Sequence, residues 1–337
     1  AKEVAEEEVM EEEVMEEELT LVALMEMGQN FEYDEPYLEG LRVVYSDIIG
    51  GMPFTDDASA STKEQFLLAG GTEENWIYLD NQYDSDIAIK NFDIIVAEMP
   101  DAVINFQGDA NLHAVWKEKM DEAGIEALIA IELDIPDIPA VAINNWEASY
   151  IGGEYAADLI EAWDNGFDDL DLIILGQEVR GGAQALDRSE GFGKALADRG
   201  GFDVEDPIIV REDFGAGLAE EAKEAMANIL AANPDAEYIA FTTINDETMS
   251  GAISAIEAAG KWDPDKIVNI SYGCDGVGKN LIREGKLDSS IAWYPERYGR
   301  YLIPLLIAVI EGIEVPHAYY MTTSPVTPFN IDEVYPE

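Results

Sequence analysis

The sequence has few of the residues on which disulfide, metal or nucleophilic chemistry depends. Its 337 residues include one cysteine, Cys274, and two histidines, His113 and His317. A single cysteine excludes an intramolecular disulfide, and neither an H-E-x-x-H nor a G-x-S-x-G motif is present. We therefore expect no catalytic residue, no metal site and no cofactor. Cys274 is interpreted as a small buried residue and His113 as a surface or capping residue.

Basic residues are also scarce. Only 19 Lys and Arg stand against 71 Asp and Glu, which gives a formal net charge of −52. A surface of this sign repels phosphate backbones and anionic headgroups, so no nucleic-acid partner is expected. No acidic run has the spacing of a calcium loop, and we interpret the acidity as a solvating, salt-tolerant surface.

Long apolar runs are absent as well. No run approaches the roughly 18 residues that a membrane-spanning helix needs. The first residues have neither the basic nor the apolar region of a signal peptide. The sequence alone leaves two expectations open, a cytoplasmic protein or an exported one from which a signal segment has been removed.

The first 18 residues are strongly acidic. The pentad E-E-E-V-M occurs at 6–10 and again at 11–15, and ten of the eighteen residues are Glu. Such a segment repels itself and is predicted to be an extended acidic linker, which in an exported protein could separate a globular head from a membrane anchor. The alternative is a short acidic helix with a Val/Met stripe.

Short apolar runs alternate with amphipathic stretches along the rest of the chain. The expected strands are 19–25, 76–79, 102–105, 127–131, 141–143, 170–175, 208–210, 238–242, 267–271 and 289–293. The expected helices are 37–49, 87–97, 112–123, 148–163, 184–198, 218–231, 247–259 and 298–310. This alternation is typical of α/β folds with parallel sheets. Ten strands are many for one such sheet, so we predict two lobes, with the polar stretch 50–75 as a surface excursion.

One segment resembles a phosphate-binding loop. G-C-D-G-V-G-K-N at 273–280 follows an expected strand, but Asn280 stands where the loop needs the Ser or Thr that holds magnesium. The broken motif makes nucleotide hydrolysis a remote alternative.

Polar and aromatic residues follow many of the expected strands, where open α/β sheets bind ligands. They are Gln29, Asn30, Phe31, Gln107, Asp109, Glu132, Asp134, Phe214, Asn245, Asp246, Asp275 and Trp293. Amides and carboxylates can bind hydroxyl groups while aromatic rings cover C–H faces, which suits a polyhydroxylated ligand. Polar loops on an acidic protein with aromatics in its core would give the same composition, so composition leaves both readings open.

The chain from about residue 19 to 336 resembles the ribose/galactose-binding type of periplasmic binding protein, the type I solute-binding proteins of ABC transporters. Five segments in the family's order carry the resemblance: N-N-W-E-A-S-Y-I-G-G-E at 144–154, R-S-E-G-F at 188–192, N-D-E-T-M-S-G-A at 245–252 with A-A-G-K at 258–261, E-G-K-L at 284–287 with I-A-W-Y-P at 291–295, and G-I-E-V-P at 312–316. Trp293 and Leu133 stand where ribose binders of the family carry glutamine and arginine, which argues against ribose itself.

The resemblance implies two Rossmann-like lobes, each a parallel sheet flanked by helices, joined by three hinge crossovers. We assign 19–143 plus 294–323 to the N-terminal lobe and 144–293 plus 324–337 to the C-terminal lobe. The implied ligand-binding residues are Gln29, Asn30, Phe31, Glu132, Arg188, Phe214, Asn245, Asp275 and Trp293. Under this assignment the 273–280 segment is a ligand loop rather than a phosphate loop.

The resemblance implies an extracytoplasmic receptor that captures a small polar ligand, expected to be a monosaccharide, and delivers it to the membrane subunits of an ABC transporter. We expect a monomer in the periplasm or at the cell surface, with lipid anchoring as one option. Nucleoside or autoinducer binding and a sensory receptor of the same fold are the alternatives. A sugar-responsive transcription regulator would need a basic helix-turn-helix domain, and the chain begins instead with its acidic segment.

Overall fold

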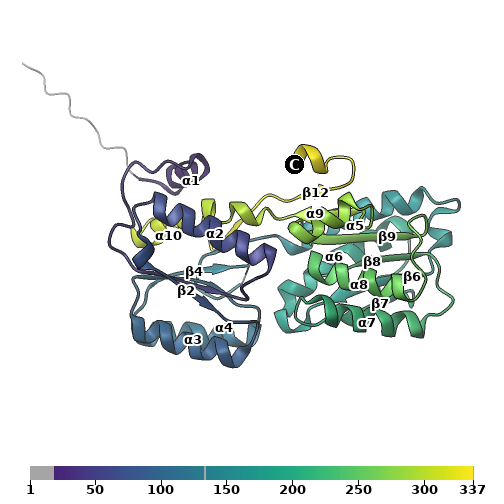
Figure 1. Cartoon of the computed structure of the whole chain (residues 1–337), viewed down its shortest axis with the longest axis horizontal. Helices are drawn as coiled ribbons and strands as arrows, with labels where there is room; N and C mark the ends of the chain where they lie inside the picture. The colour runs from purple at the N-terminus through teal and green to yellow at the C-terminus, as the bar shows by residue number, and fades with distance from the viewer. Residues whose placement is uncertain (1–18, 133, 337) are drawn as a thin grey trace, which may run out of the picture.

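The computed structural model describes residues 19–132 and 134–336 and contains two α/β lobes side by side (Figure 1). Each lobe is built on a six-stranded, mostly parallel sheet, which confirms the predicted fold class. The first sheet has the order β11 (Ala318–Tyr320), β5 (Ala140–Ala142), β4 (Ala127–Ile131), β3 (Ala102–Phe106), β1 (Val43–Asp47), β2 (Trp76–Asp80). The second has the order β12 (Ser324–Val326), β10 (Ser289–Ala292), β9 (Ile267–Gly273), β8 (Ile239–Thr242), β6 (Leu172–Gln177), β7 (Ile209–Asp213). The acidic linker predicted for residues 1–18 lies outside the described residues, as does Leu133.

Helices cover both faces of each sheet. Those of the first lobe are α1 (Leu21–Asn30), α2 (Pro53–Leu68), α3 (Ser85–Glu98), α4 (His113–Ala123) and α10 (Gly299–Ile310). Those of the second are α5 (Asn145–Glu161), α6 (Gly182–Gly200), α7 (Ala219–Ala232), α8 (Asp246–Ala258) and α9 (Gly276–Arg283), with α11 (Ile331–Val334) near the C-terminus. The short turns η1 (Glu73–Asn75), η2 (Ala110–Leu112), η3 (Gly166–Asp169), η4 (Val179–Gly181) and η5 (Pro295–Arg297) complete the chain. No described helix is long and apolar enough to span a membrane.

Successive residues of the central strands point to opposite faces of the sheet, so they pack into two different hydrophobic cores. In β6, Ile173 and Leu175 join the core that includes α5 and α6, whereas Leu172 and Ile174 join the core under α7 and α8. The strands are therefore buried on both faces, which explains why they read as continuous apolar runs in the sequence.

The chain passes between the two sheets three times: from β5 into α5, from β10 towards α10, and from β11 to β12. β12 then pairs with β10 antiparallel, through Ser290–Val326 and Ala292–Ser324, whereas every other strand pair is parallel in the described part of the chain. The lobe boundaries given above remain our interpretation of this path.

The first lobe begins differently from the prediction. Residues 19–25 were expected to form a strand, but residues 21–25 belong to α1. The helix begins after Thr20, whose hydroxyl accepts a hydrogen bond from Ala23 N (3.2 Å). The segment consists mainly of strong helix formers. Its buried residues lie on one face, and α1 packs on α10 so closely at Gly28 that a Cβ there would lie 2.5 Å from Arg300 O.

Two neighbouring predictions were wrong for the same reason: the first strand of the sheet was expected at 19–25, one element before its true position. The segment 37–49 was predicted as a helix but contains β1, which pairs with β2 and β3 in the first sheet. The stretch 50–75 was predicted as an excursion but contains α2, sixteen residues long. The buried face of α2 consists of Thr55, Ala58, Thr62, Gln65 and Phe66, so it shows almost no apolar periodicity in the sequence.

At the end of β1, Asp47 is a fully buried carboxyl with a single side-chain donor. Tyr78 Oη donates to its Oδ2 (3.0 Å), while its Oδ1 has no partner among the described residues. Burial raises the pKa of Asp47 to about 7, against the hydrogen bonds of Tyr78 and Ile48. The folded chain therefore binds this proton more tightly than the unfolded chain.

We expect Asp47→Asn to make stability less dependent on pH. Because the pKa of Asp47 is higher in the folded state, its contribution is most favourable near pH 4 and is lost progressively as the pH rises towards 7. Urea unfolding at pH 5 and pH 8 measures the difference. Wild type should lose more free energy of unfolding than Asp47→Asn over this interval, while Glu64→Gln, an exposed carboxylate on α2, should behave as wild type. Parallel losses in wild type and Asp47→Asn would contradict the prediction.

Candidate ligand-binding site

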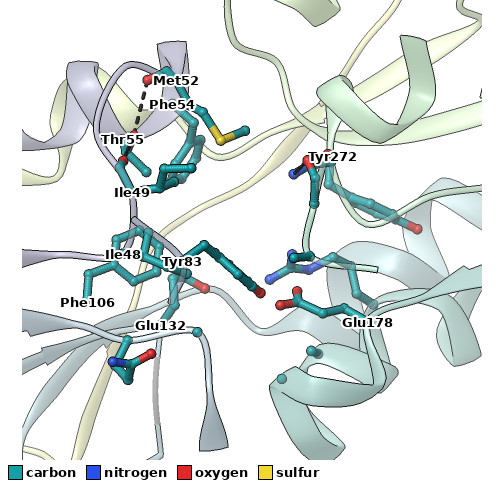
Figure 2. Close-up of a pocket in the computed structure, with 18 of the residues that line it drawn as sticks. Ile48, Ile49, Met52, Phe54, Thr55, Tyr83, Phe106, Glu132, Glu178 and Tyr272 are labelled. Atoms are coloured by element: carbon teal, nitrogen blue, oxygen red, sulfur yellow. Dashed lines mark hydrogen bonds between the residues drawn. The ribbon is translucent and has the colours of Figure 1, made fainter. Parts of the chain in front are cut away.

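A cavity of about 120 Å³ lies between the two lobes, at the carboxyl ends of their parallel strands. The first lobe contributes loops that follow β1, β2, β3 and β4, and the second contributes residues at the ends of β6 to β10 together with one face of α6. Figure 2 shows Ile48, Ile49, Phe54 and Tyr83 of the first lobe on one side of the cavity and Tyr272 and Glu178 of the second on the other. Open α/β sheets bind ligands at this edge.

Arg188 provides the positive charge of the cavity wall. It lies on α6, where its Nε donates to Asn145 Oδ1 (3.1 Å) and its Nη1 donates to the carbonyl of Ile244 (3.0 Å). Its guanidinium carbon lies 4.3 Å from the centroid of the Trp293 ring, which is a cation–π contact. These contacts leave part of the guanidinium fork for a ligand in the cavity.

Glu132 faces Arg188 from the other lobe. It follows β4 in the left-handed conformation, with φ of 61°, and accepts hydrogen bonds from Tyr298 Oη and from Ile143 N (3.4 Å). Burial raises the pKa of Glu132, while the Tyr298 hydroxyl and the charge of Arg188 act in the opposite direction. The carboxyl is thus held in a fixed orientation on the cavity wall.

Three aromatic rings in contact with one another form part of the apolar wall. Trp293 is edge-on to Phe54, with 5.8 Å between ring centroids, and tilted against Tyr272 at 6.3 Å. Phe54 comes from α2 of the first lobe and the other two rings from the second, so the contact crosses the cleft. Rings beside amide and carboxyl groups can cover the C–H face of a sugar while the polar groups bind its hydroxyls.

Several polar atoms at the cavity have no partner in the described chain. Tyr83 Oη, Gln107 Nε2 and Trp293 Nε1 are buried and make no hydrogen bond to residues 19–132 or 134–336. All three residues line the cavity. A buried donor without a partner lowers stability. A ligand in the cavity that accepts hydrogen bonds from these atoms would remove that cost.

The phosphate-loop pattern has a structural explanation. Asp275 caps α9 by accepting from Val277 N (2.8 Å) and Gly278 N (3.3 Å), in the place where a phosphate would lie. Gly278 lies against the buried carboxyl of Asp246, so that a Cβ there would lie 2.3 Å from Asp246 Oδ2. Burial and the neighbouring Asp275 raise the pKa of Asp246 well above its usual range. Two carboxyl groups fill this helix start, and a phosphate would be repelled from it.

A second arginine bridges the lobes beside the cavity. Arg180, in η4 of the second lobe, donates to the carbonyl of Tyr83 (3.0 Å) and to Ser85 Oγ (2.8 Å) of the first. Its Nε lies 3.4 Å from Asp109 Oδ2, and its guanidinium carbon lies 4.8 Å from the centroid of the Tyr83 ring. Burial opposes ionisation of Asp109, but hydrogen bonds from Ser85 and Asn111 and the charge of Arg180 hold its pKa below the usual range. The lobes are thus in contact across the mouth of the cleft.

The structure brings five of the nine predicted ligand-binding residues to the cavity wall. These are Glu132, Arg188, Asn245, Asp275 and Trp293. Asn245 also caps α8 and donates to Gly217 O (3.1 Å), which leaves it little further hydrogen-bonding capacity. Contact of these five residues with a ligand stays a prediction.

The other four predicted residues lie elsewhere. Gln29 and Asn30 are at the end of α1, beside Tyr301 and Tyr319 in a surface groove, and Phe31 is the C-cap of that helix with Arg300 over its ring. Their placement after a first strand was wrong because α1 precedes that strand. Phe214 is fully buried in the second lobe and does not line the cavity.

Sequence reasoning missed several lining residues. Phe54 and Met52 belong to the stretch that was predicted as an excursion, and Tyr83 follows β2 in a turn without a recognisable motif. Glu178 follows β6 but lies in no motif of the resemblance. A correct position for the first strand would have identified the 48–54 loop as the first ligand-binding loop.

Two α/β lobes that enclose a polar and aromatic cavity at their strand ends define a cleft-type binding protein. A model of the family described as "Periplasmic binding protein domain" matches residues 51–314. The chain belongs to this family of periplasmic binding proteins. Membership of a family of binding proteins agrees with the expectation that the chain is not an enzyme. Within residues 19–132 and 134–336, no group of three His, Cys, Asp or Glu side chains is arranged to hold a metal ion.

Among curated proteins, the chain is similar to the ribose import binding protein RbsB of Salmonella typhimurium, with 31% identity over 171 residues. The match covers 50% of this chain and 52% of that protein, so the chain spans about half the length of the curated relative.

Solved structures share the fold at low identity. A solute-binding protein from Agrobacterium vitis with bound allitol aligns with a TM-score of 0.74 and 16% identity, over 88% of this chain and 98% of that one. One from Bacillus halodurans C-125 with bound myo-inositol aligns with a TM-score of 0.71 and 21% identity, over 88% and 98%. At these identities the likeness establishes the fold, not the ligand.

Proposed function

We propose that this chain is an extracytoplasmic solute receptor that encloses a sugar or sugar alcohol between its lobes and presents it to an ABC transporter. The observation that carries the proposal is the cavity itself. Both lobes line it, aromatic rings form part of its wall, and the buried donors of Tyr83, Gln107 and Trp293 have no partner in the described chain. A polyhydroxylated ligand supplies acceptors for these donors and apolar faces for the rings.

The relatives support this ligand class. RbsB is by name a ribose import binding protein, and the two structural neighbours hold allitol and myo-inositol, both polyols. Ribose itself is disfavoured here because Trp293 stands beside Arg188 where ribose binders of this type carry glutamine. The family's periplasmic character supports a location outside the cytoplasm.

Calorimetry against pentoses, hexoses, sugar alcohols and nucleosides tests the proposal. We expect one sugar or sugar alcohol to bind with Kd near or below micromolar, about −8 kcal/mol. Binding should quench or shift the fluorescence of Trp293, which lies on the cavity wall. Binding of nucleosides alone, or of no compound in the panel, would show that the ligand class is wrong.

A further inference from the structure

Glu178 differs from the other carboxyl groups of the cleft. It follows β6 in the second lobe, is 9% exposed and lines the cavity. Glu132 accepts from Tyr298 and Asp275 accepts from Val277 N, whereas no hydrogen-bond donor of residues 19–132 or 134–336 is directed at the Glu178 carboxyl. Its environment is therefore incomplete without a donor from outside the chain.

The groups around Glu178 come from both lobes. Arg188 on α6 and Arg180 in η4 act on it with positive charge, and Asp213 at the end of β7 acts with negative charge. From the first lobe, the Tyr83 side chain extends across the cavity towards Glu178 (Figure 2). Burial raises the pKa of Glu178 to about 7, despite the charges of the two arginines.

Neither arginine is placed to satisfy this carboxyl. Arg188 is oriented by Asn145, by the Ile244 carbonyl and by the Trp293 ring, and Arg180 by its contacts across the cleft. Neither forms a salt bridge with Glu178 within the described residues. The two charges balance Glu178 at a distance and leave its oxygens directed at the cavity.

We propose that Glu178 is a specificity-determining residue that selects the ligand by charge. It accepts a hydrogen bond from a hydroxyl or amino group of a neutral or amine-bearing polyol and rejects the corresponding acid or phosphate ester. This inference rests on the proposed function and makes its ligand class narrower.

The balance of charge at the cavity supports the proposal. Glu132, Glu178 and Asp275 line the wall together with one cationic side chain, Arg188. An anionic ligand would lose its hydration and meet an excess of carboxylates, so it would be repelled. A hydroxyl or ammonium donor would complete the hydrogen bonding of Glu178, and hydrogen bonds to charged groups are the stronger ones.

Calorimetry with matched neutral and charged probes tests the inference on the full chain. The neutral probes are D-ribose, D-galactose and myo-inositol, and the charged ones are D-ribose 5-phosphate, D-galacturonate, myo-inositol 1-phosphate and D-galactosamine. Measurements at about pH 8, one unit above this pKa, keep Glu178 largely ionised. We expect each anionic probe to bind at least tenfold more weakly than its neutral parent. D-galactosamine should bind at least as tightly as D-galactose.

The variant Glu178→Gln keeps the size of the side chain and removes its charge. It should reduce the preference for the neutral over the anionic probe by at least tenfold, and it should weaken D-galactosamine more than D-galactose. Glu212→Gln is the matched control, since Glu212 is an exposed carboxylate on β7 of the same lobe and does not line the cavity.

The outcomes separate the two proposals. Binding of a neutral probe with the same charge preference in wild type and Glu178→Gln would overturn the role of Glu178 and leave the receptor function standing. An anionic probe that binds wild type as tightly as its neutral parent would do the same. No binding of any sugar or sugar alcohol, among these probes or in the wider panel above, would overturn the sugar receptor itself.

Discussion

Replacing Arg188 with alanine is expected to lower the affinity for the cleft ligand by at least tenfold while the fold remains intact. The guanidinium stacks on Trp293 at 4.3 Å and is the cation that faces both Glu132 and Glu178. Without it, the fork of donors directed at the ligand is lost, and two buried carboxyl groups face the ligand without a balancing charge. The carboxyl groups can take up protons instead of unfolding the lobe.

The measurement is calorimetric Kd together with a thermal melt of the same samples. Arg211→Ala is the matched control, because Arg211 also lies in the second lobe and forms a two-bond ion pair with Glu190 (2.8 and 2.9 Å) outside the cavity. It should change the melting temperature at most. If Arg188→Ala bound the ligand as tightly as wild type, Arg188 would have no part in the site.

The second lobe could be predicted from the sequence almost element by element, and the beginning of the first could not. β6, β8, β9 and β10 are buried along their whole length, and α5 to α8 have apolar residues at helical spacing, whereas β7 is fully buried only at Ile209. The face of α2 that is buried consists mainly of Thr, Ala and Gln, which carries no such signal. In α1, Leu24 and Met25 are adjacent apolar residues that suit a strand as well as a helix, and only packing on α10 distinguishes the two.

In the candidate site too, residues were placed correctly at the cavity wall only where the preceding strand had been located correctly. Glu132, Asn245 and Asp275 could be predicted because each follows a strand that was located correctly. Gln29, Asn30 and Phe31 were misplaced because the first strand was located one element too early, and Phe54 of α2 contributes an aromatic ring to the cavity instead. Glu178 could not be predicted as a special residue because its property is the lack of a hydrogen-bond donor among the described residues. That property depends on where side chains from the strand ends of both lobes meet.

The contacts of Arg180 bear on how binding becomes a signal. Its partners Tyr83, Ser85 and Asp109 all belong to the first lobe, while Arg180 belongs to the second, so these contacts exist only when the lobes are together. Gln184 Oε1 accepts from Asp134 N (3.1 Å) at the same mouth. Because the lobes are connected only by the three passages of the chain described above, they can move as rigid bodies about those segments.

We therefore expect Arg180→Gln to shift the chain towards an open form without changing either lobe. The substitution removes charge-assisted hydrogen bonds that the open form does not make, and contacts of this kind contribute about 1.5–3 kcal/mol each when well buried. Arg180 is one third exposed, so we expect a smaller total effect, a Kd weakened about three- to thirtyfold, mainly through faster dissociation. Small-angle scattering should show a decrease in the radius of gyration when wild type is saturated with ligand, and a higher ligand concentration should be needed for that decrease in Arg180→Gln.

Arg199→Gln separates loss of the bridge from loss of a positive charge. Arg199 pairs with Asp158 (2.9 Å) and Glu161 (2.8 Å) inside the second lobe and has no contact across the cleft within the described residues. It should leave both Kd and the scattering transition unchanged. Superimposable scattering curves of wild type with and without a tightly bound ligand would contradict closure. The cleft would then be a rigid pocket, and a transporter could recognise occupancy only through the ligand itself, because a rigid protein presents the same surface in both states.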